Sequence, residues 1–332
     1  MRAHVPDASL RGIDVVEAHS GTTGRARVVL THDDPRLPAS VFVKLAPFDV
    51  GQRGFVEQQG MGRAEARFYA EISGEIPVRL PRAWYAAHDD AGRYVMVLED
   101  LVSVGAAYPT LCEVDRSFVE GTIDAMAALH ARFWASPRFS RDRDLAWVER
   151  RSRGYGSAAP LVSFALEQLG ADLPEGSRRL GAVCVERADG VAAFLARGTS
   201  TLVHGDAHLG NMFVDDGKPG FLDWAMVSCA PGLRDVAYFL CASVPTDVRR
   251  AGERGFIARY CDRLREGGVA LDIDVAWDQY REQLVTGWIA AAVTAAMGSH
   301  WQPIEVGRAA TARADAAIAD HDIADLLQAR LR

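Results

Sequence analysis

The feature that most constrains this chain is a polar run, H-G-D-x-H-x-x-N, which spans residues 204–211 and separates two apolar stretches. Asp206 provides a carboxylate, Asn211 follows it five residues later, and Asp223 comes twelve residues after that, behind a short apolar strand. Such a set of oxygen donors suits phosphoryl transfer from a magnesium nucleotide. Asp206 would accept the proton of the attacking hydroxyl, while Asn211 and Asp223 would bind Mg²⁺ through hard oxygen ligands.

The spacing of this run equals that of the catalytic loop of protein kinases, with Gly205 in the place of its arginine. A purely structural alternative is that His204 and Asp206 cap a turn while Asn211 forms an Asx-turn. The rest of the chain distinguishes the two, because phosphoryl transfer also needs a cationic anchor for the phosphates.

Lysine is rare in this chain, and its position is therefore informative. Of 37 basic residues only Lys44 and Lys218 are lysines, and Lys218 lies in a predicted hairpin turn where its identity hardly matters. Lys44 lies in the β-branched and apolar run 40–46, which is typical of a strand. A compact ammonium suits phosphate oxygens there better than a bulky guanidinium. The alternative is an edge-strand lysine that discourages aggregation.

From residue 13 to residue 101 the pattern is rich in strands and contains one helix. Runs of β-branched, aromatic and apolar residues predict strands over residues 15–18, 26–30, 41–46, 83–87 and 94–98. Apolar residues at four-residue spacing predict a helix over 62–73. Glu65 lies in the first turns of this helix, so we expect it to pair with Lys44 and hold it against the nucleotide. A solvated helix charge is the alternative for Glu65.

Two loops of the same region are candidate nucleotide contacts. The connection over residues 20–25 is rich in glycine and threonine, so the backbone N–H groups of Ser20, Gly21 and Thr22 are suited to phosphate oxygens. An ordinary hairpin fits these residues equally well. Farther along, an apolar strand meets an acidic pair at 97–101, the hinge position of a two-lobed kinase. We expect backbone groups around Glu99 and Leu101 to contact the adenine edge.

After Asp100 the pattern changes to helices. We expect an amphipathic helix over 116–134, helical regions over 136–200 and 233–332, a strand over 201–203, and a hairpin formed by 212–214 and 220–222. His130 is expected to be a core histidine hydrogen-bonded to backbone. Asp235 is expected to be the N-cap of the helix that follows it, and a bond from its side chain back to the catalytic loop stays open.

Bulk properties exclude several classes of protein. The chain of 332 residues suits two lobes that each bury a core, and its formal charge of −7 argues against a nucleic-acid partner. The first residues have no apolar signal-peptide core, and the longest apolar segment, 288–297, is too short to cross a bilayer. Five widely spaced cysteines without a C-x-x-C motif predict buried thiols in a reducing compartment. We therefore expect a cytoplasmic protein without membrane contact.

Together these residues make the sequence similar to the aminoglycoside phosphotransferase and choline kinase superfamily, and within it to the ecdysteroid-kinase-like branch. The likeness covers nearly the whole chain and rests most specifically on 204–211 and on Leu222-Asp223-Trp224. The supporting segments are 65–72, 98–101, 129–134 and 235–240. The sequence departs from the pattern in two places: the loop over 20–25 is not dense in glycine, and Ala225 stands where many relatives of this branch have glutamine.

The resemblance implies an α+β, two-lobed, protein-kinase-like fold. A small antiparallel-sheet N-lobe over residues 1–100 would bind the nucleotide, and a larger helical C-lobe over residues 101–332 would carry the catalytic loop and the substrate-binding helices. It also implies that ATP and Mg²⁺ are used to phosphorylate a hydroxyl of a small organic molecule. By motif, the base is Asp206, the metal ligands are Asn211 and Asp223, and the phosphate-anchoring ion pair is Lys44 with Glu65.

Two other functions fit the sequence less well. A protein kinase is disfavoured, because only eleven residues separate Asp223 from Asp235 and no A-P-E motif follows, which leaves no room for a peptide-docking segment. A catalytically inactive nucleotide-binding module is expected to have lost at least one key residue. The four key residues are all present: Lys44, Asp206, Asn211 and Asp223.

The substrate is less constrained by the sequence. Aromatic side chains either line a pocket for a hydrophobic or cationic substrate or belong to the core: Trp277, Tyr280, Trp288, His300 and Trp301. Acidic side chains near the C-terminus either attract an aminoglycoside-like polycation or form a solvated face: Asp315, Asp320, Asp322 and Asp325.

Overall fold

The structure is a computed structural model that describes residues 9–20, 23–49, 51, 53–54, 60–109, 114–148, 158–298 and 303–332. The chain forms two compact units: Met1–Tyr108 with Met212–Val227, and Pro109–Asn211 with Ser228–Arg332. We call these the N-terminal unit and the C-terminal unit. The division of function between residues 1–100 and 101–332 stays a prediction, whereas compactness adds residues 212–227 to the N-terminal unit.

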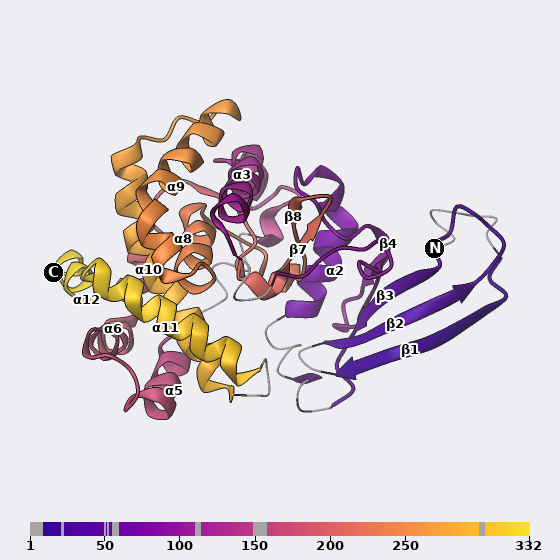
Figure 1. Cartoon of the computed structure of the whole chain (residues 1–332), viewed down its shortest axis with the longest axis horizontal. Coiled ribbons are helices and arrows are strands. Elements are labelled where there is room, and N and C mark those ends of the chain that lie inside the picture. The colour runs from indigo at the N-terminus through magenta and orange to yellow at the C-terminus, as the bar shows by residue number, and fades with distance from the viewer. Residues whose placement is uncertain are drawn as a thin grey trace. The chain divides into compact units, whose positions relative to one another are not determined.

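The N-terminal unit is built on one antiparallel sheet with the strand order β1-β2-β3-β5-β4 (Figure 1). Its strands are β1 (Gly12–Ser20), β2 (Gly24–Thr31), β3 (Ser40–Leu45), β4 (Ala83–His88) and β5 (Tyr94–Glu99). All of the strands predicted for this region form. Because β3 pairs with β2 on one side and β5 on the other, the edge-strand alternative for Lys44 is wrong. The predicted α+β fold class is confirmed.

Helix α2 (Met61–Glu71) packs against β4 and β5 and is followed by the short 3-10 helix η1 (Ser73–Glu75). The face predicted to be apolar is buried, with Phe68 inaccessible to solvent and Glu65 buried beside it. The ring of Phe68 stacks on Trp224, with centroids 4.1 Å apart and planes 7° from parallel. This stack joins α2 to η4 (Trp224–Met226), the turn that directly follows Asp223.

The hairpin of β7 (Met212–Asp215) and β8 (Lys218–Phe221) belongs to the same unit. Asp216 and Gly217 join its strands with positive φ angles of 49° and 72°, the conformation that a type I′ hairpin turn requires. Arg79 holds the hairpin to the sheet, because its guanidinium contacts Asp215 on β7 and Glu99 on β5. The hairpin thus fixes the start of the segment that carries Asp223.

The C-terminal unit is mainly helical, as predicted. Its helices are α3 (Arg116–Phe133), α5 (Ala159–Leu169), α6 (Glu175–Glu186), α7 (Ala188–Leu195), α8 (Leu233–Ala242), α9 (Thr246–Glu266), α10 (Ile273–Ala296), α11 (Ile304–Asp320) and α12 (Ile323–Arg330), with the short helices η2 (Pro137–Phe139) and η3 (Leu209–Asn211). In Figure 1 they run from magenta through orange to yellow. The two-stranded sheet of β6 (Ser200–Val203) and β9 (Ser228–Pro231) brackets the predicted catalytic loop.

Helix α10 is the centre of this unit and packs against α8, α11 and α5. Its side chains Tyr280 and Trp288 are inaccessible to solvent, so the core alternative for these two aromatic residues is confirmed. The apolar segment 288–297 lies almost entirely within this buried helix. His300 and Trp301 lie outside the described residues. Across the described part of the chain, no helix combines the length and apolarity that crossing a membrane would take.

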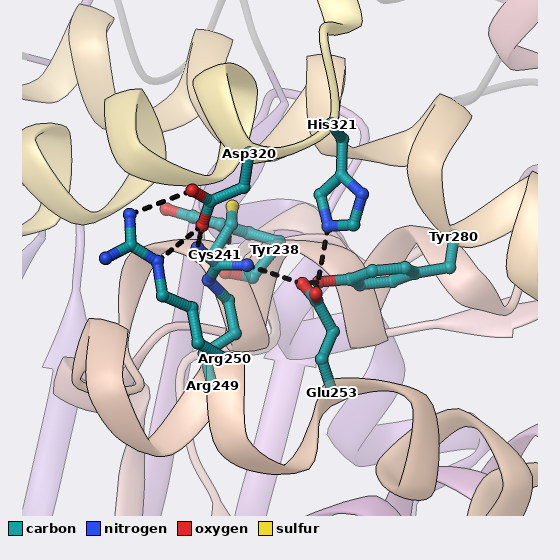
Figure 2. A network of polar contacts seen from close by, with 8 residues as sticks. All are labelled: Tyr238, Cys241, Arg249, Arg250, Glu253, Tyr280, Asp320 and His321. Atoms are coloured by element: carbon teal, nitrogen blue, oxygen red, sulfur yellow. Dashed lines mark hydrogen bonds and ion pairs between the residues drawn. The ribbon is translucent and has the colours of Figure 1, made fainter.

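A polar network is buried where α9 meets α10 and the junction of α11 and α12 (Figure 2). The carboxylate of Glu253 accepts a hydrogen bond from Arg249 at 2.7 Å and another from the Tyr280 hydroxyl, and it contacts His321 Nε2 at 2.9 Å. Arg249 also bonds to Asp320. Burial alone would raise the pKa of Glu253, but these partners outweigh it and hold the pKa below its ordinary value.

The acidic residues near the C-terminus are therefore not simply a solvated face. Asp320 pairs with Arg249 and Arg250, and Asp325 pairs with Arg179. Asp315 accepts hydrogen bonds from Ser177 at 2.6 Å and from the Trp288 indole at 2.9 Å. Three of the four carboxylates are thus committed to contacts within the C-terminal unit.

Three of the four described cysteines follow the prediction of buried thiols. Cys184, Cys241 and Cys261 are buried free thiols, and Cys229 is half-buried. Cys112 lies outside the described residues. Burial raises the pKa of Cys184 and of Cys241 to about 12, so both thiols are unreactive at neutral pH.

Candidate functional site

The N-terminal unit brings Lys44 to two carboxylates at once. Strand β3 directs its side chain inward, where Nζ lies 2.8 Å from Glu65 Oε1 on α2 and 3.3 Å from Asp223 Oδ1. The Lys44 side chain is only 5% exposed and that of Glu65 is fully buried, whereas Asp223 is 24% exposed. The ion pair predicted between Lys44 and Glu65 is present, and the structure adds Asp223 as its third member.

Burial and mutual contact shift the pKa values of Lys44 and Glu65. Burial alone would lower the pKa of Lys44, but Asp223 and Glu65 outweigh it, so its pKa is raised and the ammonium stays charged. Burial raises the pKa of Glu65 to about 7, and the charge of Asp223 adds to the rise while Lys44 opposes it. A pKa of about 7 leaves the Glu65 carboxyl only partly ionised at neutral pH.

Asp223 is held in an unusual backbone conformation. Its φ of 62° and ψ of 64° lie in the left-handed region, which costs a non-glycine residue about 1 kcal/mol, less for aspartate than for most. The next residue locks this turn, because the Trp224 ring stacks on Phe68 and its backbone N–H donates to Glu65. The same aromatic contact thus sets the directions of both carboxylates around Lys44.

In the C-terminal unit the backbone of the predicted catalytic loop is hydrogen-bonded to the buried side chain of Asp235. The backbone N–H groups of His204 and Gly205 donate to Asp235 at 2.6 Å and 3.0 Å, one to each carboxylate oxygen. Gly205 has a φ of 83°, which lets the loop turn back on itself at this point. Burial would raise the pKa of Asp235, but hydrogen bonds and nearby histidines outweigh it and hold the pKa below its ordinary value.

The expectation that Asp235 is an N-cap is wrong. Helix α8 begins at Leu233, its N-cap is Gly232, and no side chain caps it. Asp235 is the third helical residue, and its carboxylate reaches back to the catalytic-loop backbone, the role that the sequence left open. An aspartate in the first turn still suits the helix dipole.

His130 supports Asp235 from the other side. Its Nε2 lies 3.4 Å from Asp235 Oδ2 and its Nδ1 lies 2.9 Å from the Tyr260 hydroxyl. Its backbone carbonyl accepts a hydrogen bond from Thr201 on β6. His130 is a core residue, as predicted, but its ring bonds to side chains rather than to backbone.

Asp206 and Asn211 lie in contact, as the spacing predicts. Asn211 Nδ2 donates to Asp206 Oδ2 at 2.9 Å and to the Asp206 carbonyl at 3.0 Å. His208 Nε2 lies 3.6 Å from the same carboxylate oxygen. The turn bonds of the structural alternative are also present, since Asp206 N–H donates to His204 Nδ1. The Asp206 carboxylate nevertheless remains 35% exposed, so a substrate can reach it.

The surroundings of Asp206 keep it ionised. Burial would raise its pKa, but the charge of His208, hydrogen bonds from His208 and Tyr238, and the charge of His204 lower the pKa to about 2. A carboxylate of this kind is a weak base that accepts a proton only when the donor has become strongly acidic. Orientation of a hydroxyl is therefore its first task, and proton uptake comes late in the reaction.

The sequence missed His208 and Tyr238 as partners of Asp206. Tyr238 lies on α8 one helical turn after Asp235, so the spacing of three residues already places both on one face of the helix. His208 is the second histidine of the H-G-D-x-H-x-x-N run. The sequence therefore contained both clues, namely the helical spacing of Tyr238 and the second histidine of the run. Only the fold shows that the face of α8 with Asp235 and Tyr238 packs against the catalytic loop.

The remaining predicted contacts divide into two groups. The Glu99 carboxylate binds Arg79 and the Arg82 N–H, and Leu101 is 6% exposed, so neither side chain is directed to a ligand. In the backbone, the Glu99 N–H donates to the Arg82 carbonyl at 2.8 Å and the Leu101 carbonyl accepts from the Ala106 N–H at 3.0 Å, so these two groups are not free for a nucleotide base. The Ser20 side chain, Gly21 and Thr22 lie outside the described residues.

The predicted metal ligands have the right chemistry for Mg²⁺. Because Asn211 uses its amide nitrogen on Asp206, its amide oxygen is the atom left to face a cation, and Asp223 adds a carboxylate. No cluster of three or more His, Cys, Asp or Glu side chains able to hold a metal occurs among the described residues. Asn211 in the C-terminal unit and Asp223 in the N-terminal unit thus each carry an oxygen of the kind that Mg²⁺ binds, and Mg²⁺ commonly keeps several waters and binds substrate phosphates as well.

Comparison with known proteins places these features in context. A model of the phosphotransferase enzyme family matches residues 15–282. The GDP complex of wild-type aminoglycoside 2′-phosphotransferase-IIIa is 14% identical, with 95% of this chain and 96% of that chain covered and a TM-score of 0.54. Choline kinase from Cryptosporidium parvum Iowa II is 12% identical, with coverages of 96% and 94% and a TM-score of 0.58. Ethanolamine kinase from Plasmodium vivax is 11% identical, with coverages of 94% and 82% and a TM-score of 0.51. At these identities the likeness is one of fold, and no curated protein sequence matches the chain.

Proposed function

The chain belongs to the phosphotransferase enzyme family, and on this premise we propose that it transfers the γ-phosphate of Mg²⁺-ATP to a hydroxyl of a small organic molecule. The observation that carries the proposal is the arrangement of Lys44 between Glu65 and Asp223. The fold also supports it, because the chain resembles an aminoglycoside phosphotransferase and two kinases named for the small molecules choline and ethanolamine. Within the superfamily we propose the ecdysteroid-kinase-like branch.

In this proposal Lys44 binds phosphate oxygens of the nucleotide and Glu65 orients its ammonium. Asn211 and Asp223 would hold Mg²⁺, which supplies charge for the developing negative oxygens of the transferred phosphoryl group. Backbone groups at Glu99 and Leu101 would contact the base. Backbone N–H groups of Ser20, Gly21 and Thr22 would contact phosphates.

Asp206 would orient the acceptor hydroxyl and take its proton as the new P–O bond forms. Asn211 fixes one oxygen of the carboxylate, so the other oxygen is the one expected to accept the hydroxyl. Because the pKa of Asp206 is about 2, proton transfer follows bond formation rather than preceding it. This order suits the loose transition state of phosphoryl transfer, which needs little activation of the nucleophile.

Two alternatives receive less support. A protein kinase would need a peptide-docking segment, yet the residues between Asp223 and Asp235 are already used by η4, by β9 and by the start of α8. An inactive nucleotide-binding module would not need an ionised and exposed Asp206 fixed by Asn211. We further propose a small-molecule partner, no nucleic-acid partner, and a cytoplasmic location.

The test is ADP release from Mg²⁺-ATP across a panel of hydroxylated compounds that includes aminoglycosides, macrolides, choline-like amines, sterols and sugars. Because one structural relative is a GDP complex, each compound is also assayed with GTP. The proposal expects a substrate-dependent signal that the Asp206→Asn variant lacks. An equal signal in the variant would contradict it.

A further inference from the structure

We infer that Arg25 is a second phosphate-binding residue of the N-terminal unit, and that it contacts the phosphate chain of the nucleotide together with Lys44. The inference rests on the proposed function and adds a residue to its nucleotide site. Arg25 is the second residue of β2, the strand that lies between β1 and β3 in the sheet (Figure 1). Lys44 lies on β3, so the two basic residues belong to neighbouring strands.

The strand register places these two side chains on one face of the sheet. Arg25 and Lys44 are directly paired residues of the antiparallel strands β2 and β3. The Cβ atoms of such a pair lie about 4.5–5.5 Å apart on the same face. Gly24 allows β2 to approach β3 closely here, because a Cβ at this residue would lie 2.8 Å from the Ala46 carbonyl oxygen. Arg25 is therefore held beside the proposed phosphate anchor.

The pair places two positive charges side by side. Burial and, to a smaller extent, the charge of Arg25 lower the pKa of Lys44, against the rise that Asp223 and Glu65 cause. Like charges at directly paired positions destabilise a sheet. A phosphate group bound by both cations removes this repulsion, whereas an uncharged base or sugar does not. The arrangement therefore favours the phosphate chain over the rest of the nucleotide as the partner of Arg25.

A second arginine on the same face shows how a guanidinium is held here by a protein acceptor. Arg27 is two residues further along β2 and therefore faces the same way as Arg25. Its Nε donates to Asp100 Oδ2 at 2.7 Å, and the Ser40 hydroxyl donates to the same oxygen at 2.5 Å. The Nε of Arg25 is also buried, but it has no hydrogen-bond partner among the residues that the structure describes. A phosphate oxygen would supply the missing acceptor.

The row that Arg25 shares with Lys44 continues onto β1 with a third basic residue. His19 is directly paired with Arg25, and its Nε2 lies 2.7 Å from Glu17 Oε1. Residues 20–24, which connect these two strands and precede Arg25, are all uncharged. The three side chains thus form a basic row across β1, β2 and β3, and such a row attracts an anion. Arg25 is its middle member and is only half-buried, so a ligand can reach it.

The test measures the dissociation constants of Mg²⁺-ATP and of adenosine by calorimetry for the wild type and three variants. Arg25→Gln removes the charge, whereas Arg25→Lys keeps the charge but loses the planar fork that binds two phosphate oxygens. Arg36→Gln is the matched control, because Arg36 is exposed in the connection between β2 and β3, where it contacts Asp34. Adenosine carries the base and the sugar without phosphate, so it reports on contacts to those parts alone.

We expect Arg25→Gln to weaken Mg²⁺-ATP binding at least tenfold and to leave adenosine binding within twofold of the wild type. Arg25→Lys should lose less affinity for Mg²⁺-ATP than Arg25→Gln, and Arg36→Gln should bind both ligands within twofold of the wild type. The thermal midpoint of nucleotide-free Arg25→Gln should equal or exceed that of the wild type, because a like charge opposite Lys44 is removed. An arginine with a purely structural role would give a lower midpoint.

Three results would overturn the inference while the proposed function stands. These are a loss of Mg²⁺-ATP affinity below tenfold in Arg25→Gln, an equal loss for Mg²⁺-ATP and adenosine, and a fall of several degrees in the nucleotide-free midpoint. The second result would place Arg25 against the base, and the third would make its role structural.

Failure of the proposed function looks different. Mg²⁺-ATP would then bind in an Arg25-dependent way, while ADP release with every acceptor would be the same in the wild type and in Asp206→Asn. A wild type that does not bind Mg²⁺-ATP would remove both the function and the inference.

Discussion

Asp235 holds the loop that carries Asp206 through the backbone of His204, whose N–H donates to Asp235 Oδ2 at 2.6 Å. The Asp235 carboxylate contacts Nε2 of His130, and Nδ1 of the same ring contacts the Tyr260 hydroxyl. Every member of this chain is buried. The position of the proposed base therefore depends on a buried charge as well as on the loop's own turn bonds.

The first prediction concerns Asp235→Asn. The amide nitrogen of asparagine would face one of the two backbone N–H groups, so one hydrogen bond is lost and a donor is left unpaired. We expect unfolding free energy to fall by roughly 1–3 kcal/mol and kcat to fall at least tenfold, with Mg²⁺-ATP affinity within threefold. Urea denaturation and steady-state kinetics measure both. Asp247→Asn is the matched control, since Asp247 is exposed in the first turn of α9. Equal effects in the two variants would contradict the positioning role.

The second prediction is that replacement by arginine impairs activity at Lys44 but not at Lys218. Lys44 is enclosed by Glu65 and Asp223, so the larger guanidinium of Lys44→Arg would displace one of these carboxylates. We expect kcat/KM for Mg²⁺-ATP to fall by roughly 10²-fold or more, because the phosphate anchor and a metal ligand are disturbed together. Lys218→Arg is the control, because Lys218 is exposed on β8. Retained activity in Lys44→Arg would remove the anchor assignment.

The third prediction uses the depressed pKa of Glu253. A lowered pKa in the folded state stabilises the protein above the unfolded value of about 4.3, and this stabilisation is lost as pH falls through the lower folded pKa. Glu253→Gln also breaks a buried ion pair with Arg249. We expect it to lower the unfolding free energy at pH 7 by about 3 kcal/mol and to reduce the loss of stability below pH 4. A variant with wild-type stability at pH 7 would contradict this assignment.

The fourth prediction concerns Asp315, whose pKa is shifted in the opposite direction to that of Glu253. Burial raises the pKa of Asp315, while hydrogen bonds from Ser177 and Trp288 only partly offset it. Such a group destabilises the fold when ionised, so its contribution becomes more favourable as pH falls through the raised pKa. Asp315→Asn keeps an acceptor oxygen for both donors. We expect its thermal midpoint at pH 7 to equal or exceed that of the wild type, whereas a fall of several degrees would show that the charge itself is needed.

The fifth prediction concerns thiol reactivity. Burial raises the pKa of Cys184 and Cys241 to about 12 and that of Cys261 to about 11, so few thiolates exist at pH 8. In the native protein at most two of the five cysteines should react with a disulfide reagent such as DTNB, and all five should react in guanidinium chloride. Mass spectrometry identifies the labelled residues. Fast native labelling of Cys241 would mean that the packing of α8 is looser than the structure shows.

Much of the site could be predicted from local sequence. The contact between Asp206 and Asn211 follows from their spacing in one loop, and the pair of Lys44 and Glu65 follows from a strand lysine succeeded by a helix. Both predictions also drew on the known catalytic loop and Lys–Glu ion pair of kinases.

The other features of the fold and site depend on contacts between segments far apart in the sequence, and hydrophobic periodicity does not predict such contacts. Strand β9 was not predicted because four residues gain strand structure only by pairing with β6, far away in sequence. The hairpin of β7 and β8 was predicted, but not that it would cluster with the N-terminal unit. The N-cap expectation for Asp235 failed because the helix begins two residues earlier, and helix boundaries are the least certain feature of a pattern.

The measurement that tests the central claim most directly compares the wild type with Asp206→Asn in two assays on the same preparation. Calorimetry gives the Mg²⁺-ATP affinity, and ³¹P NMR follows formation of the phosphate ester of the accepted alcohol. The account predicts an affinity unchanged within threefold and a turnover lowered by roughly 10²–10⁴-fold, the usual contribution of a general base. Phosphate ester formed at the wild-type rate by Asp206→Asn would contradict it.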